Sequence, residues 1–123
     1  MGFLRVRPNE ICVIPRGIRF HISLPAGPVR GFGLEVYEGH FDVPELGPIG
    51  SCGLANIRDF EIPTASCDSS DIDTQVFTKL AGKIHRSSFR GSIFNVAGWH
   101  GTCYPFKYDL GKFTSDFHCS EAG

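Results

Sequence analysis

The stretch RFHISL, residues 19–24, alternates strictly between polar and apolar side chains and decides the fold class. Its three apolar side chains share one side of the chain, as expected for a β-strand with one wet face. A Pro/Gly-rich turn, residues 25–28, ends the run, and the alternation resumes over residues 32–36. The two runs therefore predict an antiparallel hairpin.

Shorter stretches on either side of this hairpin also favour strands. Residues 4–6 and 11–14 are apolar or alternating, and Pro8-Asn9 between them is typical of a turn. Residues 76–84 repeat the pattern, with Ala81-Gly82 as the turn and a return strand after it. Turn signals about 8–12 residues apart are typical of a β-sandwich or barrel.

The composition agrees with an all-β, antiparallel fold in one domain. The chain has 123 residues, a length that fits a single domain. It contains 15 Gly and 8 Pro, which disfavour long helices, and 11 Phe, which favour half-buried pleated surfaces. Long loops are expected as well. Residues 44–63, with glycine at 47, 50 and 53, predict a structured loop, and the polar residues 64–74 predict an exposed, mobile connection.

The charge and cysteine content exclude several classes of function. The net charge is −1, and residues 1–63 and 64–123 are each nearly balanced, so nucleic acid is not an expected partner. No apolar stretch approaches the roughly 20 residues that span a bilayer, and the N-terminus lacks the apolar core of a signal peptide. The five cysteines have no regular spacing, which favours a reducing compartment. We expect a cytoplasmic protein.

Three side-chain groupings are candidates for chemistry. His100, Cys103, His118 and Cys119 could supply four zinc ligands, but adjacent ligands point apart, and a structural His100 in a Gly-flanked turn is the stronger interpretation. Ser51-Cys52 could act as a nucleophile, but no base is marked for it. The acidic residues Glu35, Glu38 and Glu45 favour a solvated face over an acid/base pair. The residues by themselves indicate no catalytic site.

Five stretches resemble one family. They are PNEICVIPRGIRF (8–20), LEVYEGHF (34–41), LGPIGSCGLANIRDF (46–60), FNVAGWHG (94–101) and YPFKYDL (104–110). In this order they resemble homogentisate 1,2-dioxygenase, the iron-dependent enzyme that opens an aromatic ring in tyrosine and phenylalanine catabolism. The resemblance covers residues 2–113, so residues 1–113 are predicted to be a cupin-like segment of that enzyme and residues 114–123 a divergent tail.

The resemblance implies a partial cupin-like β-sandwich or barrel. Residues 15–20, PRGIRF, are similar to the second cupin motif, with Phe20 where a metal-binding cupin has histidine. An aromatic ring cannot bind iron, so this part is expected to be a structural core whose turn depends on Pro15 and on positive φ at Gly17. His21 is one residue out of register and should face the opposite side.

The family's Fe(II) is held by two His and one Glu in a region that this sequence does not match. No histidine here has Glu six residues later, and His118 is out of register with the family's proton-accepting histidine. We therefore assign no catalytic, cofactor-binding or metal-binding residue to this chain. It also departs from the family at residues 65–68 and 87–95, where aromatic and polar family residues are replaced, and it begins at what resembles a mid-sheet strand, so exposed sheet edges are expected.

The resemblance implies a role in cleaving homogentisate with O2 to maleylacetoacetate. This chain is expected to be a fragment or relative of that enzyme that lacks the iron ligands and is inactive alone. The alternative is a metal-free cupin-like module that binds a homologous subunit or another protein, by strand addition or homo-oligomer packing. A zinc module built on His100, Cys103, His118 and Cys119 is a third possibility.

Overall fold

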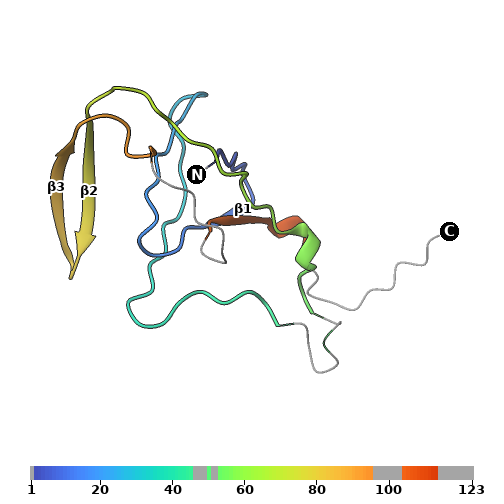
Figure 1. Ribbon diagram of the computed structural model, residues 1–123. Helices are drawn as coiled ribbons and strands as arrows, with labels where there is room; N and C mark the ends of the chain where they lie inside the picture. The colour runs from blue at the N-terminus through green and yellow to red at the C-terminus, as the bar shows by residue number, and fades with distance from the viewer. Residues whose placement is uncertain (1, 46–49, 51–52, 96–103, 114–123) are drawn as a thin grey trace.

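The computed structural model describes residues 2–45, 50, 53–95 and 104–113, and in these ranges it is built from strands and long connections (Figure 1). The elements are β1 (Glu10–Val13), the 3-10 turn η1 (Ile57–Asp59), β2 (Thr74–Leu80), β3 (Lys83–Phe89), β4 (Phe106–Asp109) and the 3-10 turn η2 (Leu110–Lys112). All strand pairing is antiparallel. The prediction of an all-β, antiparallel chain with long loops is confirmed.

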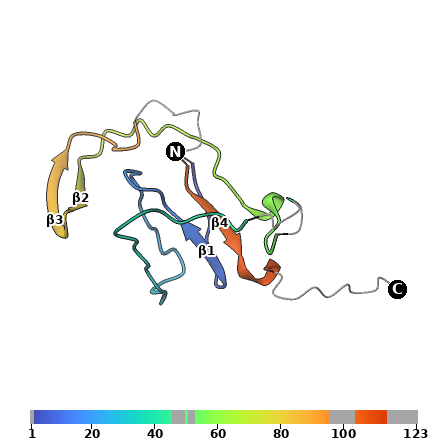
Figure 2. The ribbon, with the colours of Figure 1, turned by 90° about the horizontal axis from the view of Figure 1, so that it is seen from below.

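The four strands form two separate two-stranded sheets. β1 pairs with β4, and β2 pairs with β3. The β2–β3 hairpin extends away from the β1–β4 sheet in both views (Figures 1 and 2). The side chain of Arg19, in the chain after β1, reaches the end of the hairpin, because its guanidinium donates to the Ile93 carbonyl at 3.1 Å and lies 5.3 Å from the centre of the Phe89 ring.

The β1–β4 sheet joins residues about a hundred positions apart. Glu10 opposes Asp109 and Val13 opposes Phe106. A turn at residues 7–10 leads into β1, and a hydrogen bond from the Glu10 N–H to the Arg7 carbonyl at 3.1 Å closes it. Asn9 has φ 69° in that turn, a left-handed conformation that Asn tolerates better than most residues. The predicted strand at residues 11–14 and the turn at Pro8-Asn9 are confirmed.

The β2–β3 hairpin is a local structure. Seven residue pairs run from Thr74 opposite Phe89 to Leu80 opposite Lys83. Ala81 and Gly82 both have positive φ, 48° and 76°, as a two-residue hairpin loop requires. The predicted strand, turn and return strand at residues 76–84 are confirmed.

Three other strand predictions are wrong. Residues 4–6, 19–24 and 32–36 form no regular strand, although the turn between the latter two exists, with Gly27 at φ 99° and its N–H 3.2 Å from the Leu24 carbonyl. The apolar face of the alternation is uncovered, since Phe32 is fully exposed. Two short strands whose apolar face is not packed are only marginally stable as a pair in water. An alternating sequence by itself therefore does not ensure that the strands pair.

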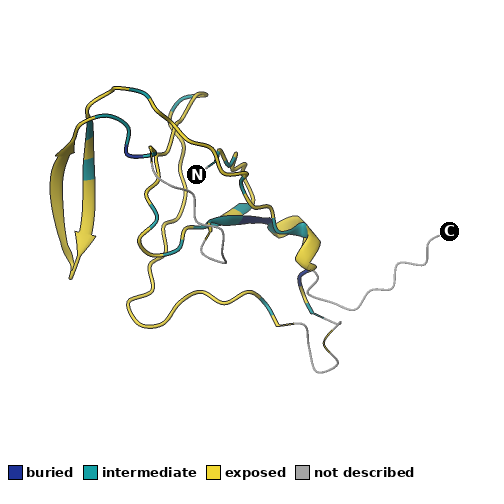
Figure 3. Ribbon diagram, in the orientation of Figure 1, coloured by how far each residue is buried: buried dark blue, intermediate teal, exposed yellow. Residues whose placement is uncertain are grey.

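The described chain has a very small interior. The buried residues among those described are Ala55, Ile93, Lys107 and Tyr108. Figure 3 shows exposed chain over most of the remainder. Residues 64–73 are exposed apart from Ser70, as predicted for that connection. The predictions for Gly47, for residues 98–101 and for the tail 114–123 lie outside the described residues.

Candidate functional site

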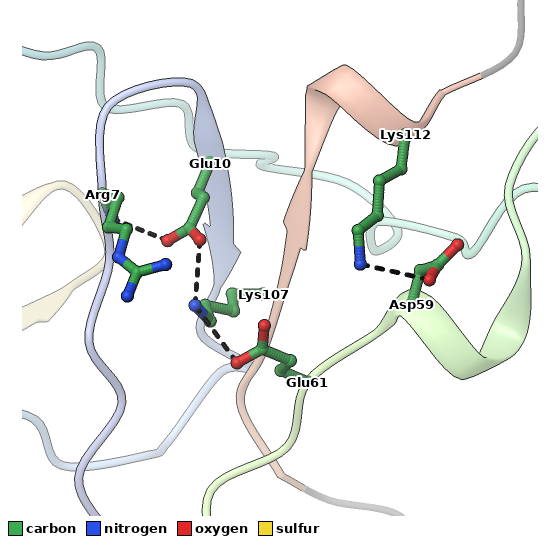
Figure 4. A network of polar contacts seen from close by, with 6 residues as sticks. All are labelled: Arg7, Glu10, Asp59, Glu61, Lys107 and Lys112. Carbon is green, nitrogen blue, oxygen red and sulfur yellow. Dashed lines mark hydrogen bonds and ion pairs between the residues drawn. The ribbon is translucent and has the colours of Figure 1, made fainter.

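Lys107 is the centre of the best-organised polar group in the described chain (Figure 4). It lies in the middle of β4, and its side chain is only 6% exposed. Its ammonium nitrogen Nζ lies 3.0 Å from Glu10 Oε1 of β1 and 3.2 Å from Glu61 Oε2. A buried ammonium group is stable only when it is paired and hydrogen-bonded, and these two carboxylates satisfy that condition.

The backbone holds these groups in place. The Glu61 N–H donates to the Lys107 carbonyl at 3.0 Å, and the Lys107 N–H donates to the Glu61 carbonyl at 2.9 Å. β4 is therefore paired with β1 on one edge and bridged to Glu61 on the other. Glu10 Oε2 accepts the Arg7 N–H at 2.6 Å, so both oxygens of this nearly buried carboxylate have partners.

Electrostatics keep the group ionised. The hydrogen bond from the Arg7 backbone N–H and the bond from Lys107 lower the pKa of Glu10 below its usual value. The bond to Glu10, assisted by Glu61, raises the pKa of Lys107. Lys107 is therefore a cation at neutral pH, and its ion pairs hold β1, β4 and the chain at Glu61 together. We call this group of Lys107, Glu10 and Glu61 the Lys107 tether. Because the raised pKa keeps the ammonium protonated, Lys107 is poorly suited to transfer protons.

Aromatic packing lies beside this tether. The Phe60 ring meets the Phe106 ring edge-on, with centroids 5.8 Å apart, and lies 4.7 Å from the Tyr108 ring. The Tyr108 hydroxyl is buried, and no described residue hydrogen-bonds to it. Burial and, second, the nearby Asp59 raise the pKa of Tyr108, which keeps the phenol neutral. Lys112 pairs with Asp59 at 3.2 Å at the edge of the cluster.

A second polar cluster joins residues 67–70 to residues 92–95. Asp68 accepts hydrogen bonds from the Ser92 hydroxyl at 2.7 Å and from the Ser70 N–H at 3.0 Å. The Ser92 bond is the largest cause of the lowered pKa of Asp68. The Cys67 thiol donates to Asn95 Oδ1 at 3.4 Å. The stretches 65–68 and 87–95, where the sequence is expected to depart from the family, thus meet in one small network.

The structure describes only part of the predicted candidates. The zinc candidates His100, Cys103, His118 and Cys119, and the nucleophile candidate Ser51-Cys52, lie outside the described residues. Glu35, Glu38 and Glu45 are exposed, which agrees with a solvated acidic face, and Glu35 forms an ion pair with Lys79.

The cupin-like turn is present, but no packed interior surrounds it. Gly17 has φ 84°, and the Ile18 N–H donates to the Pro15 carbonyl at 3.3 Å, as expected for that turn. Phe20 and His21 are both exposed, so the structural core expected around this motif is not formed by the described part of this chain.

Within the described ranges, metal-binding groups, cysteines and apolar helices provide no further candidate site. They hold no group of three or more His, Cys, Asp or Glu residues arranged to bind a metal ion. Cys12 is half-buried and Cys67 is exposed, and both are free thiols. None of the helical segments in the described chain is long and apolar enough to cross a membrane.

Sequence reasoning missed the Lys107 tether. A usable signal was present, because Lys107 interrupts an aromatic run, Tyr104-Pro105-Phe106-Lys107-Tyr108. A charged residue on a strand whose neighbours are aromatic must either face water or find a buried counter-charge. Its partners, Glu10 and Glu61, are 97 and 46 positions away, and no local pattern identifies them.

Comparisons with known proteins agree on one family. Residues 1–110 match the family described as homogentisate 1,2-dioxygenase N-terminal. The chain is 50% identical over 117 residues to homogentisate 1,2-dioxygenase of Emericella nidulans, covering 94% of this chain and 26% of the relative. It is 52% identical over 113 residues to the Drosophila melanogaster enzyme (91% and 26%) and 46% identical to that of Rhodopseudomonas palustris (92% and 25%). The chain spans about a quarter of the length of these relatives.

Proposed function

This chain belongs to the homogentisate 1,2-dioxygenase family, and from that membership we propose that it is a scaffold segment of an enzyme that cleaves homogentisate with O2. The observation that carries the proposal is the match of residues 1–110 to the N-terminal region of the family. The substrate and the ring-opening reaction, which yields maleylacetoacetate, belong to the whole enzyme. We propose the cytoplasm as its location.

We propose that this segment stabilises the fold of the enzyme and takes no direct part in its chemistry. The Lys107 tether and the Phe60 cluster hold β1, β4 and the chain around Glu61 together. The family's ferrous iron, when bound, supplies the centre at which O2 and substrate react. The described residues offer no ligand set that fits this metal, so we assign the iron to a region outside the described chain. Residues 1–113 are proposed as the scaffold and residues 114–123 as a divergent tail.

Oxygen uptake tests this proposal. We expect the 123-residue chain, supplied with ferrous iron and homogentisate, to consume no O2 above an iron-only control. A full-length relative serves as the positive control. Mixing the chain with a relative from which the matching N-terminal region has been deleted should restore uptake. Turnover by the chain alone, or no restoration from a folded mixture, contradicts the scaffold role.

A second candidate function is association with a homologous subunit. The observation that favours it is the large number of exposed apolar side chains, among them Phe3, Phe32 and Leu34. Phe32 and Leu34 lie two positions apart, and neighbouring exposed apolar side chains are typical of interaction sites. Size-exclusion chromatography with and without a full-length relative tests this function, and a chain that elutes as an unchanged monomer in both runs contradicts it.

A further inference from the structure

The direction of the β2–β3 hairpin is set at its base. The hairpin extends away from the β1–β4 sheet, and residues 67–73 lead into it while residues 89–93 lead out of it (Figures 1 and 2). We call residues 89–93 the strap. The contacts that hold the strap determine how firmly the hairpin is fixed to the chain around it.

The first contact joins the strap to the chain that enters the hairpin. The Ser92 hydroxyl donates to Asp68 Oδ2 at 2.7 Å, and the Ser92 N–H donates to the Ser70 carbonyl at 3.0 Å. The Asp68 carboxylate is itself held, because its Oδ1 accepts the Ser70 N–H at 3.0 Å. These bonds extend the pairing of the two segments beyond Thr74 and Phe89, where the β2–β3 ladder ends.

The second contact reaches the strap from the cupin-like turn. Arg19 follows the turn that is closed by the bond from the Ile18 N–H to the Pro15 carbonyl. Its guanidinium donates to the carbonyl of the buried Ile93 at 3.1 Å and lies 5.3 Å from the centre of the Phe89 ring. One planar side chain therefore contacts both ends of the strap, by a hydrogen bond and by a cation–π contact.

Between these two ends lies the point at which the strap turns. Gly91 has φ 76°, a conformation that residues with a side chain rarely adopt. A Cβ at this position would have the Ser70 carbonyl oxygen as its one neighbour within 4 Å, at 3.8 Å. Glycine is therefore required here by the backbone conformation and not by crowding. A glycine with so few neighbours bends readily unless contacts on both sides hold it.

The hairpin has one further contact, nearer its loop. Lys79 forms an ion pair with Glu35, and its ammonium lies 5.3 Å from the centre of the Tyr37 ring. The two charged side chains are 42% and 52% exposed, and exposed ion pairs between long side chains contribute little to stability. Glu35 also belongs to no regular strand. The strap contacts should therefore hold the hairpin more firmly than this ion pair does.

We propose that the strap is a hinge with Gly91 as its pivot, and that Arg19 and the Asp68–Ser92 pair lock it. With both contacts in place, the hairpin moves together with the rest of the described fold. With both removed, it swings as a paired unit, because its ladder and its loop are local to residues 74–89. This inference rests on contacts within the chain, and it does not depend on the dioxygenase role.

Backbone amide NMR relaxation of the 123-residue chain tests the lock. In the unmodified chain we expect order parameters of about 0.85 in both the hairpin and the β1–β4 sheet. In the double variant Arg19→Met/Ser92→Ala the hairpin values should fall below about 0.6, while the sheet values stay unchanged. Cross-strand nuclear Overhauser effects, such as those between Thr78 and His85, should persist because the hairpin remains paired. Each single variant should have a smaller effect than the double variant.

The matched control is Lys79→Met/Ser87→Ala, which removes a cation and a serine hydroxyl within the hairpin and leaves the strap contacts intact. It should keep the order parameters of the unmodified chain. The proposal is overturned by a control that mobilises the hairpin as much as the double variant does, or by a double variant that stays rigid. It is equally overturned if the cross-strand effects vanish together with the order, or if the hairpin of the unmodified chain is already mobile. None of these readouts involves O2 uptake, so failure here leaves the scaffold role standing.

Discussion

The β1–β4 sheet and the β2–β3 hairpin are held together in opposite ways. β1 and β4 form only four pairs across about a hundred positions, and a nearly buried lysine between two carboxylates holds them in place. β2 and β3 form seven pairs across a two-residue loop, with almost every side chain exposed. Non-local pairing here depends on side-chain contacts, whereas local pairing depends on turn geometry and leaves both faces of the hairpin exposed.

Removing the charge of Lys107 should produce the largest difference in stability between the β1–β4 sheet and the hairpin. Lys107→Met leaves Glu10 nearly buried without its cation, and we expect the β1–β4 sheet to lose protection from amide exchange. Protection in the hairpin should change little. The matched control is Lys79→Met, which removes an exposed cation. Equal effects of the two substitutions contradict this account.

Truncating the aromatic cluster should have the next largest effect. A fully buried Phe→Ala change costs about 3–5 kcal/mol, and the half-buried Phe60 should cost about 2 kcal/mol of unfolding free energy. Urea unfolding monitored by near-ultraviolet circular dichroism measures it. Phe77→Ala in the exposed hairpin should cost less than about 0.5 kcal/mol. Comparable costs would show that the hairpin is packed as well.

Lowering the pH should affect the β1–β4 sheet before the hairpin. The pKa of Glu10 is lowered in the fold, so its ionised form stabilises the fold above its ordinary value of 4.5. That stability is lost as the pH falls through the lower folded pKa. Urea unfolding of the chain and of Glu10→Gln between pH 7 and pH 3 measures it. The variant should be less stable at neutral pH and should converge with the unmodified chain in acid. A constant difference across that range excludes Glu10 as the titrating group.

The hairpin loop should give the smallest effect, a gain in stability. Ala81 has φ 48°, a conformation that costs an L-residue about 1–2 kcal/mol, and Asn adopts it more readily. Ala81→Asn should therefore stabilise the hairpin by about 0.5–1 kcal/mol, measured by amide exchange in β2 and β3. Ala81→Val should have the opposite sign, because a β-branched residue tolerates positive φ poorly.

Much of the local structure was predictable from sequence. The strand at residues 11–14, the turn at Pro8-Asn9 and the whole unit at residues 76–84 follow from apolar patterning and turn residues, and all are present. The hairpin predicted from residues 19–24 and 32–36 failed, because its apolar face has no covering layer. Alternation of polar and apolar residues predicts which face of a strand would be buried. It does not predict whether another layer of the protein covers that face.

The family and the all-β class were determined by the sequence, because motif order and turn chemistry are properties of neighbouring residues. The tertiary structure alone decided that Lys107 meets Glu10 and Glu61, and that Asp68 meets Ser92. It also showed that Lys79 of the hairpin meets Glu35, 44 positions away. These results depend on which distant segments share space, and burial energetics across the whole fold determine that.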